Sequence, residues 1–148
     1  MSTFMETFAQ LRDEKRYDEI IAALPYARLM GVEFGEDEQG ELLFRLPFLE
    51  RNVGNVTLPA LHGGLIGGFL ENTALLHLMW NRESLTTPKI VDFSLDYLRS
   101  GRAQTLYAQC EITKQGKRVA HVLIEAWQDD RNKPVAVARA HFLLSPGS

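Results

Sequence analysis

Cysteine is nearly absent from this chain, because Cys110 is the only one among its 148 residues. An internal disulfide framework is therefore excluded. The chain also lacks an excess of positive charge, because its formal net charge is −3 at pH 7. No nucleic-acid partner is therefore expected. No apolar run of transmembrane length is free of Gly, His and Glu, and no basic-then-apolar signal is seen at the N-terminus. We therefore expect a soluble cytoplasmic protein with no membrane partner.

Patterns that hold metals or nucleotides are missing as well. The four histidines show no metal-ligand spacing, so no metal site is predicted. The glycines at 63–64 and 67–68 match neither the P-loop nor the dinucleotide-binding fingerprint. The sequence thus predicts no resident metal or redox cofactor.

The length suits one domain, which can bury roughly 68–70% of the surface of its unfolded chain. Residues 1–24 predict a helical extension, because Thr3 and Glu6 have capping-box spacing and apolar residues then recur at helical intervals. From Pro25 the chain is expected to be extended, with strands near 32–34 and 42–48 joined by a hairpin turn. We assign residues 25–148 to a single domain.

Residues 65–80 are almost all apolar or glycine, which predicts a core helix enclosed by protein. Gly64, Gly67 and Gly68 each cost up to about 1 kcal/mol relative to alanine in a helix, so a backbone or a ligand is expected to come close. Glu71 is the one acid in this run. Because acids are rarely buried without a partner or a task, Glu71, expected to be partly buried, is the leading functional candidate.

Four runs after the helix alternate apolar and polar residues with a period of two, at 91–97, 106–112, 120–126 and 136–144. They predict an antiparallel meander with one apolar face. Strands longer than the usual five or so residues can curl around a buried helix, and alanines in the last two runs leave room for it. The predicted fold class is α+β: a long central helix wrapped by a curved antiparallel sheet, with an N-terminal helical extension.

Gly64 and Glu71 are seven residues apart, so they lie within roughly 20° around the helix axis but about 10 Å apart along it. One substrate carbonyl cannot be held at Gly64 and attacked by Glu71 of the same helix. A second copy of the helix, antiparallel across a two-fold axis, brings its own Glu71 to the first helix's N-terminus. The spacing therefore predicts a homo-oligomer with sites shared between subunits.

His62, Gly63 and Gly64 open the buried helix, and Glu71 follows nine residues after the histidine. This pattern resembles the hotdog-fold acyl-CoA thioesterases, most closely the PaaI-like group. The resemblance covers roughly residues 26–145 and extends through three further segments, 91–101, 114–118 and 135–140. It implies a hotdog fold and hydrolysis of an acyl-CoA thioester to a free acid and coenzyme A, in a homodimer or a dimer of dimers.

The same resemblance implies roles for the motif residues. Glu71 is the candidate catalytic carboxylate, either attacking the thioester carbonyl or acting as general base for water. The backbone N–H groups of Gly63 and Gly64 are expected to polarise the thioester oxygen, and His62 to orient the loop or the substrate. The structural alternatives are an acid paired with a buried Arg or His, and a glycine pair needed only for a tight start to the helix.

Two positions depart from the family pattern. Related enzymes place an asparagine about six residues before the histidine; Val56 stands there, so Asn55 is the candidate and Asn52 a weaker one. A Ser or Thr near the start of the following strand is replaced by Ile90. The candidate cations for the phosphates of coenzyme A stand at strand ends, with solvated turn charges as the alternative: Arg99, Lys114, Lys117 and Arg118.

A second class of function stays open on this sequence, a non-catalytic acyl-CoA binding or sensing protein with the same fold. The missing hydroxyl at Ile90 and the displaced Asn55 favour it. A hotdog dehydratase or hydratase is the weaker enzyme alternative, because the chain lacks its arrangement of His and acid. The acyl group, the choice between coenzyme A and acyl carrier protein, and dimer against tetramer are left open by the residues.

Overall fold

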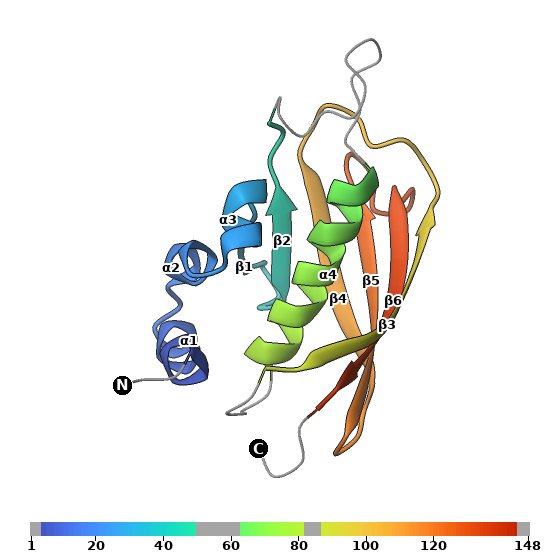
Figure 1. Ribbon diagram of the computed structural model, residues 1–148. Helices are drawn as coiled ribbons and strands as arrows, with labels where there is room; N and C mark the ends of the chain where they lie inside the picture. Colours follow the sequence, from blue (N-terminus) through green and yellow to red (C-terminus); the bar gives the residue numbers. More distant parts are fainter. Residues whose placement is uncertain (1–3, 50–62, 82–86, 145–148) are drawn as a thin grey trace.

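The computed structural model describes residues 4–49, 63–81 and 87–144. Its centre is helix α4 (Gly63–Trp80), which lies against one face of a six-stranded sheet (Figure 1). Neighbouring strands are antiparallel and follow the order β1-β2-β4-β5-β6-β3. The strands are β1 (Glu33–Glu36), β2 (Leu42–Leu46), β3 (Lys89–Tyr97), β4 (Leu106–Gln115), β5 (Val119–Trp127) and β6 (Ala136–Leu143).

Three short helices precede the sheet; the second and third lie beside β1 and β2, and the first lies next to the second (Figure 1). They are α1 (Phe4–Asp13), α2 (Tyr17–Ala22) and α3 (Pro25–Met30). Aromatic contacts join the first two to the end of α4: the Tyr17 ring stacks on Trp80 with centroids 5.3 Å apart, and Phe8 meets Trp80 edge-on at 6.5 Å. The predicted helical extension is therefore packed on the core. Thr3 of its expected capping box lies outside the described residues.

The expectation of extended chain from Pro25 is wrong, because residues 25–30 form α3. Proline suits the first turn of a helix, where its missing N–H has no partner to lose. Gly31 ends the helix with φ +82°, a left-handed conformation that glycine adopts at little cost. The helical part of the chain thus continues to Met30 before β1 begins.

The predicted meander is correct for β4, β5 and β6 and wrong for β3. Strand β3 pairs with β6 at the far edge of the sheet instead of with β4, the next strand in sequence. The chain leaves β3 after Tyr97 and passes by residues 98–105 to β4 on the other side of β5 and β6. The hairpin predicted between β1 and β2 is confirmed.

Alternation places the apolar residues as predicted on β5 and β6 but not along all of β3. The inward alanines of these two strands are almost fully buried: Ala120, Ala126, Ala136, Ala138 and Ala140. In β3 the register shifts between Ile90 and Asp92, and Val91 is left 61% exposed. A bulge inserts one residue into the ladder, so the face that Val91 was expected to share begins only at Phe93.

Helix α4 is buried on the side that faces the sheet and open on another, so its expected enclosure by protein is only partly correct for the single chain. Gly63, Gly64 and Glu71 are exposed, and Gly67 and Gly68 are half-buried. Its buried residues are Ile66, Phe69, Leu70, Thr73, Ala74, Leu76, His77, Leu78 and Met79. None of the described helices combines the length and the hydropathy that a bilayer crossing needs.

Candidate active site

The open face of α4 carries the predicted acid. Glu71 is exposed in the single chain, so the expectation of partial burial is wrong at this level of assembly. No side chain of the described ranges forms an ion pair with it. The structural alternative, an acid paired with a buried Arg or His, therefore has no partner in the described part of the chain.

The start of α4 is held by the last residue of β3. The Tyr97 hydroxyl donates a hydrogen bond of 2.5 Å to the Gly63 carbonyl oxygen. A Cβ atom on Gly63 would meet the Tyr97 ring at 3.5 Å, and one on Gly67 would meet Leu95 Cδ2 at 3.3 Å. These two glycines stand four residues apart, on one stripe of the helix, and let β3 come close to it.

The alternation in residues 91–97 predicts Tyr97 on an apolar strand face and does not predict its contact with the start of α4. The glycine spacing holds the missed signal, because two glycines one helical turn apart indicate that another element packs there. Gly68 meets a different neighbour: its Cβ would lie 3.6 Å from the Met30 sulfur of α3. The close neighbours of Gly67 and Gly68 are thus protein side chains, and not the backbone or ligand that the sequence led us to expect.

Gly64 and Glu71 lie on one continuous helix, as predicted. At 1.5 Å per residue their separation along the axis is about 10 Å. Within one copy of α4, Glu71 and the glycines at the start of the helix therefore lie on the same face but at different positions along the helix axis. His62, Asn55 and Asn52 lie outside the described residues. Ile90 is half-buried and pairs with Phe142 in the sheet.

The four candidate phosphate ligands are not brought together within one chain. Arg99 follows Tyr97, near the start of α4, and donates a 2.9 Å hydrogen bond to the Pro134 carbonyl oxygen. Lys114, Lys117 and Arg118 surround the β4–β5 turn. That turn lies at the other end of β3, because Val119 pairs with Leu143 and Leu143 pairs with Lys89. The strand between the two groups is roughly 25 Å long.

Two other titratable groups of the described ranges, His77 and Cys110, are buried. Burial lowers the pKa of His77, which is 7% exposed and whose Nδ1 finds no hydrogen-bond partner in the described structure. Burial also raises the pKa of Cys110 to about 12, so its thiol stays protonated. Within the described ranges no three or more His, Cys, Asp or Glu residues are grouped so as to hold a metal ion.

Comparison with known proteins bears on the same region. A family model described as the thioesterase superfamily matches residues 58–135, which include α4 and the strands β3, β4 and β5. The medium/long-chain acyl-CoA thioesterase YigI of Escherichia coli K12 is 27% identical over an alignment of 137 residues, and the match covers 82% of this chain and 86% of that protein.

Solved structures share the fold. A crystal structure from Chromobacterium violaceum is 72% identical and superposes with a TM-score of 0.82, covering 96% of this chain and 98% of that one. A Bacillus halodurans protein solved with CoA is 20% identical, with a TM-score of 0.72 over 100% of this chain and 98% of that one. The predicted α+β hotdog fold is confirmed, with α4 packed on the antiparallel sheet and the helices α1 to α3 before it.

Proposed function

Because the chain belongs to the thioesterase superfamily, we propose that it is an acyl-CoA thioesterase, which hydrolyses an acyl-CoA to a free acid and coenzyme A. The observation that carries the proposal is Glu71, an exposed acid on a largely apolar helix, on the face of its glycine-rich start. The name of the relative YigI, a medium/long-chain acyl-CoA thioesterase, supports the substrate class. Membership of the PaaI-like group, which the His62-Gly63-Gly64 motif suggests, is part of the same proposal.

The proposed chemistry needs one acid and one oxyanion site. Glu71 either takes a proton from water as the water oxygen attacks the carbonyl carbon, or attacks that carbon itself. In either case the carbon–sulfur bond breaks, and the thiolate of coenzyme A leaves and takes up a proton. When Glu71 itself attacks, water then hydrolyses the anhydride formed between Glu71 and the acyl group, which releases the free acid and restores the carboxylate. Backbone N–H groups at Gly63 and Gly64, at the positive end of the α4 dipole, polarise the carbonyl oxygen. A donor of this kind contributes about 2.7–4 kcal/mol to the transition state.

Two subunits are proposed to share each site. The separation of Gly64 and Glu71 along α4 is too long for one carbonyl, so the acid comes from the helix of a second copy. The single chain supports a homodimer in another way: β3 is an edge strand with exposed apolar side chains at and just after it, Val91, Tyr97 and Leu98. Such an edge is a template for association. His62 and Asn55 remain candidates for positioning the substrate or water.

A non-catalytic acyl-CoA binding or sensing protein is the second candidate. The observation that favours it is Ile90, a half-buried aliphatic residue where related enzymes have a hydroxyl. Binding without turnover does not require an acid at Glu71. The two candidates differ in whether Glu71 changes turnover.

The deciding experiment is release of free thiol from short, medium, long and aromatic acyl-CoA esters by the wild type and by Glu71→Gln. Glu38→Gln, an exposed acid in the β1–β2 turn, is the matched control. We expect turnover by wild type and control, and a loss of about a hundredfold or more in Glu71→Gln, the scale of a positioned acid or base. Full turnover in Glu71→Gln contradicts the mechanism. Acyl-CoA binding without turnover in all three proteins establishes the binding protein.

A further inference from the structure

A pocket of about 440 Å³ lies between the connection that follows β3 and the connection that follows β5. One side is formed by Arg99, Ser100 and Arg102, and the other by residues 128–130, Lys133 and Val135. We propose that this pocket binds the phosphorylated adenosine end of coenzyme A, an inference that rests on the proposed function. It adds Arg102 and Lys133 to the substrate-binding residues and separates Arg99 from the lysines at the β4–β5 turn.

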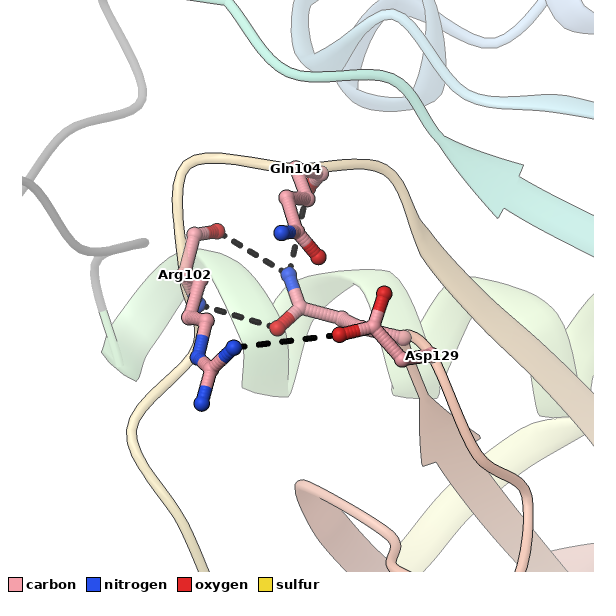
Figure 2. Close-up of polar contacts among 4 residues, drawn as sticks. Arg102, Gln104 and Asp129 are labelled. Atoms are coloured by element: carbon pink, nitrogen blue, oxygen red, sulfur yellow. Dashed lines mark hydrogen bonds and ion pairs between the residues drawn. The ribbon is translucent and has the colours of Figure 1, made fainter.

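The two sides of the pocket are tied together by Gln128 (Figure 2). Its side-chain oxygen accepts a hydrogen bond from the Arg102 N–H at 3.0 Å, and its Nε2 donates to the Arg102 and Gln104 carbonyl oxygens at 2.9 and 3.2 Å. Two of these bonds hold the backbone of Arg102, and the third holds Gln104, without using the Arg102 guanidinium. The Arg102 side chain is therefore presented from a fixed point on the rim.

The charge of the lining favours an anion. Three cations, Arg99, Arg102 and Lys133, stand against two acids, Asp129 and Asp130, which leaves an excess of one positive charge. The Asp130 carboxylate already accepts a 2.9 Å hydrogen bond from the backbone N–H of Asn132 and so builds its own turn. The Asp129 carboxylate lies 3.8 Å from the Arg102 guanidinium, and both side chains are more than 70% exposed. Exposed pairs of this kind are weak, so a phosphate dianion can replace Asp129 as the partner of Arg102.

The pocket lies near the start of α4. Arg99 stands two residues beyond Tyr97, whose hydroxyl contacts the first residue of α4. Two residues of chain span at most about 7 Å, so the pocket lies at the same end of the molecule as the proposed oxyanion site. Coenzyme A carries its phosphates at the far end of a pantetheine arm, so a thioester held at α4 needs a separate polar subsite for them. Lys114, Lys117 and Arg118 lie at the opposite end of β3.

The test compares two thioesters that share an acyl group, one of coenzyme A and one of pantetheine, which lacks the nucleotide. For Arg102→Gln/Lys133→Gln we expect KM for the acyl-CoA to rise by about tenfold for each phosphate-binding cation that is removed. We expect kcat to stay the same, and both constants for the acyl-pantetheine to stay the same. The control is Lys15→Gln/Arg45→Gln, which removes two exposed, ion-paired cations elsewhere. Both variants change exposed side chains, and a thermal melt checks their fold.

A second measurement needs no turnover. Adenosine 3′,5′-bisphosphate is titrated calorimetrically into each protein, with binding expected for wild type and control and abolished in Arg102→Gln/Lys133→Gln. An unchanged KM and unchanged bisphosphate binding in that variant overturn the proposal, as does an equal rise of KM for both thioesters. A rise of KM in Lys114→Gln/Lys117→Gln instead overturns it in favour of the opposite end of β3. If the wild type hydrolyses neither thioester, the thioesterase proposal fails. The bisphosphate titration still shows whether the pocket binds the phosphorylated adenosine end of coenzyme A.

Discussion

The Tyr97 hydroxyl donates its hydrogen bond to the carbonyl oxygen of Gly63 and so joins the last residue of β3 to the first residue of α4. Strand β3 pairs on one side only, with β6, and its other edge is open among the described strands. The position of the helix start therefore depends on an edge strand. This links the proposed oxyanion site, the edge proposed for dimerisation and the pocket after β3.

Tyr97→Phe is expected to lower both stability and turnover by small amounts. The change removes one hydrogen bond, which typically contributes about 1 kcal/mol, and keeps the ring against Gly63. If all of that free energy is lost from the transition state, kcat falls by about fivefold. Chemical denaturation and steady-state kinetics measure the two effects. A variant with wild-type stability and kcat would show that this bond does not position the helix start.

Two glycine substitutions separate close packing from helix propensity. Gly68→Ala places its Cβ 3.6 Å from the Met30 sulfur, an ordinary contact, whereas Gly67→Ala places it 3.3 Å from Leu95. Alanine favours a helix over glycine by up to about 1 kcal/mol, so Gly68→Ala is expected to raise the free energy of unfolding. Gly67→Ala is expected to gain less, because Leu95 must move. Urea denaturation of both variants checks the order, and a larger gain for Gly67→Ala would contradict it.

Subunit complementation tests the shared site. Glu71→Gln and Gly64→Val are each expected to be nearly inactive. When the two are unfolded together and refolded as a mixture, half of the dimers are mixed, and each mixed dimer has one site with neither substitution. We expect turnover to return to about a quarter of the wild-type value per protein, by this two-fold counting. A site built within one chain regains nothing on mixing, and that result would sink the shared-site proposal.

His77 is expected to make stability depend on pH. Burial holds its pKa below the ordinary 6.5, so as the pH falls below 6.5 the unfolded chain takes up a proton that the folded chain does not. The free energy of unfolding then decreases, by at most about 1.4 kcal/mol per pH unit for one proton, until the folded-state pKa is reached. Unfolding measured from pH 7.5 to 5 should show this slope in the wild type.

The slope should be reduced in His77→Leu. His121→Leu is the control, since His121 is half-buried on the other face of the sheet and its removal leaves α4 unchanged. Persistence of the full slope in His77→Leu would assign the pH dependence to another group.

Local patterns predicted most of the individual elements. Period-two alternation located β5 and β6 and their buried alanines, and an apolar run located α4, because both signals depend only on neighbours in the chain. The prediction of extended chain from Pro25 misses helix α3, although proline in a first turn favours a helix.

Long-range pairing decided the rest. Whether β3 pairs with β4 or β6 depends on how residues 98–105 cross the end of the sheet, and alternation within β3 is the same in both arrangements. The bulge at Val91 likewise arises from the register with β6. The exposure of Glu71 depends on which elements cover α4, and the sequence of the helix alone does not say which face they leave open.

By itself the sequence determined the spacing of Gly63, Gly64 and Glu71 along one helix, because helical geometry sets distances within an element. It also determined the family resemblance, which the family match supports through the thioesterase superfamily. Only the tertiary structure decided that Tyr97 holds the helix start and that Arg99 and Arg102 stand apart from the β4–β5 turn. The first relationship joins residues more than thirty positions apart, and the second separates residues that are near in sequence. Both depend on strand pairing, which no local pattern encodes.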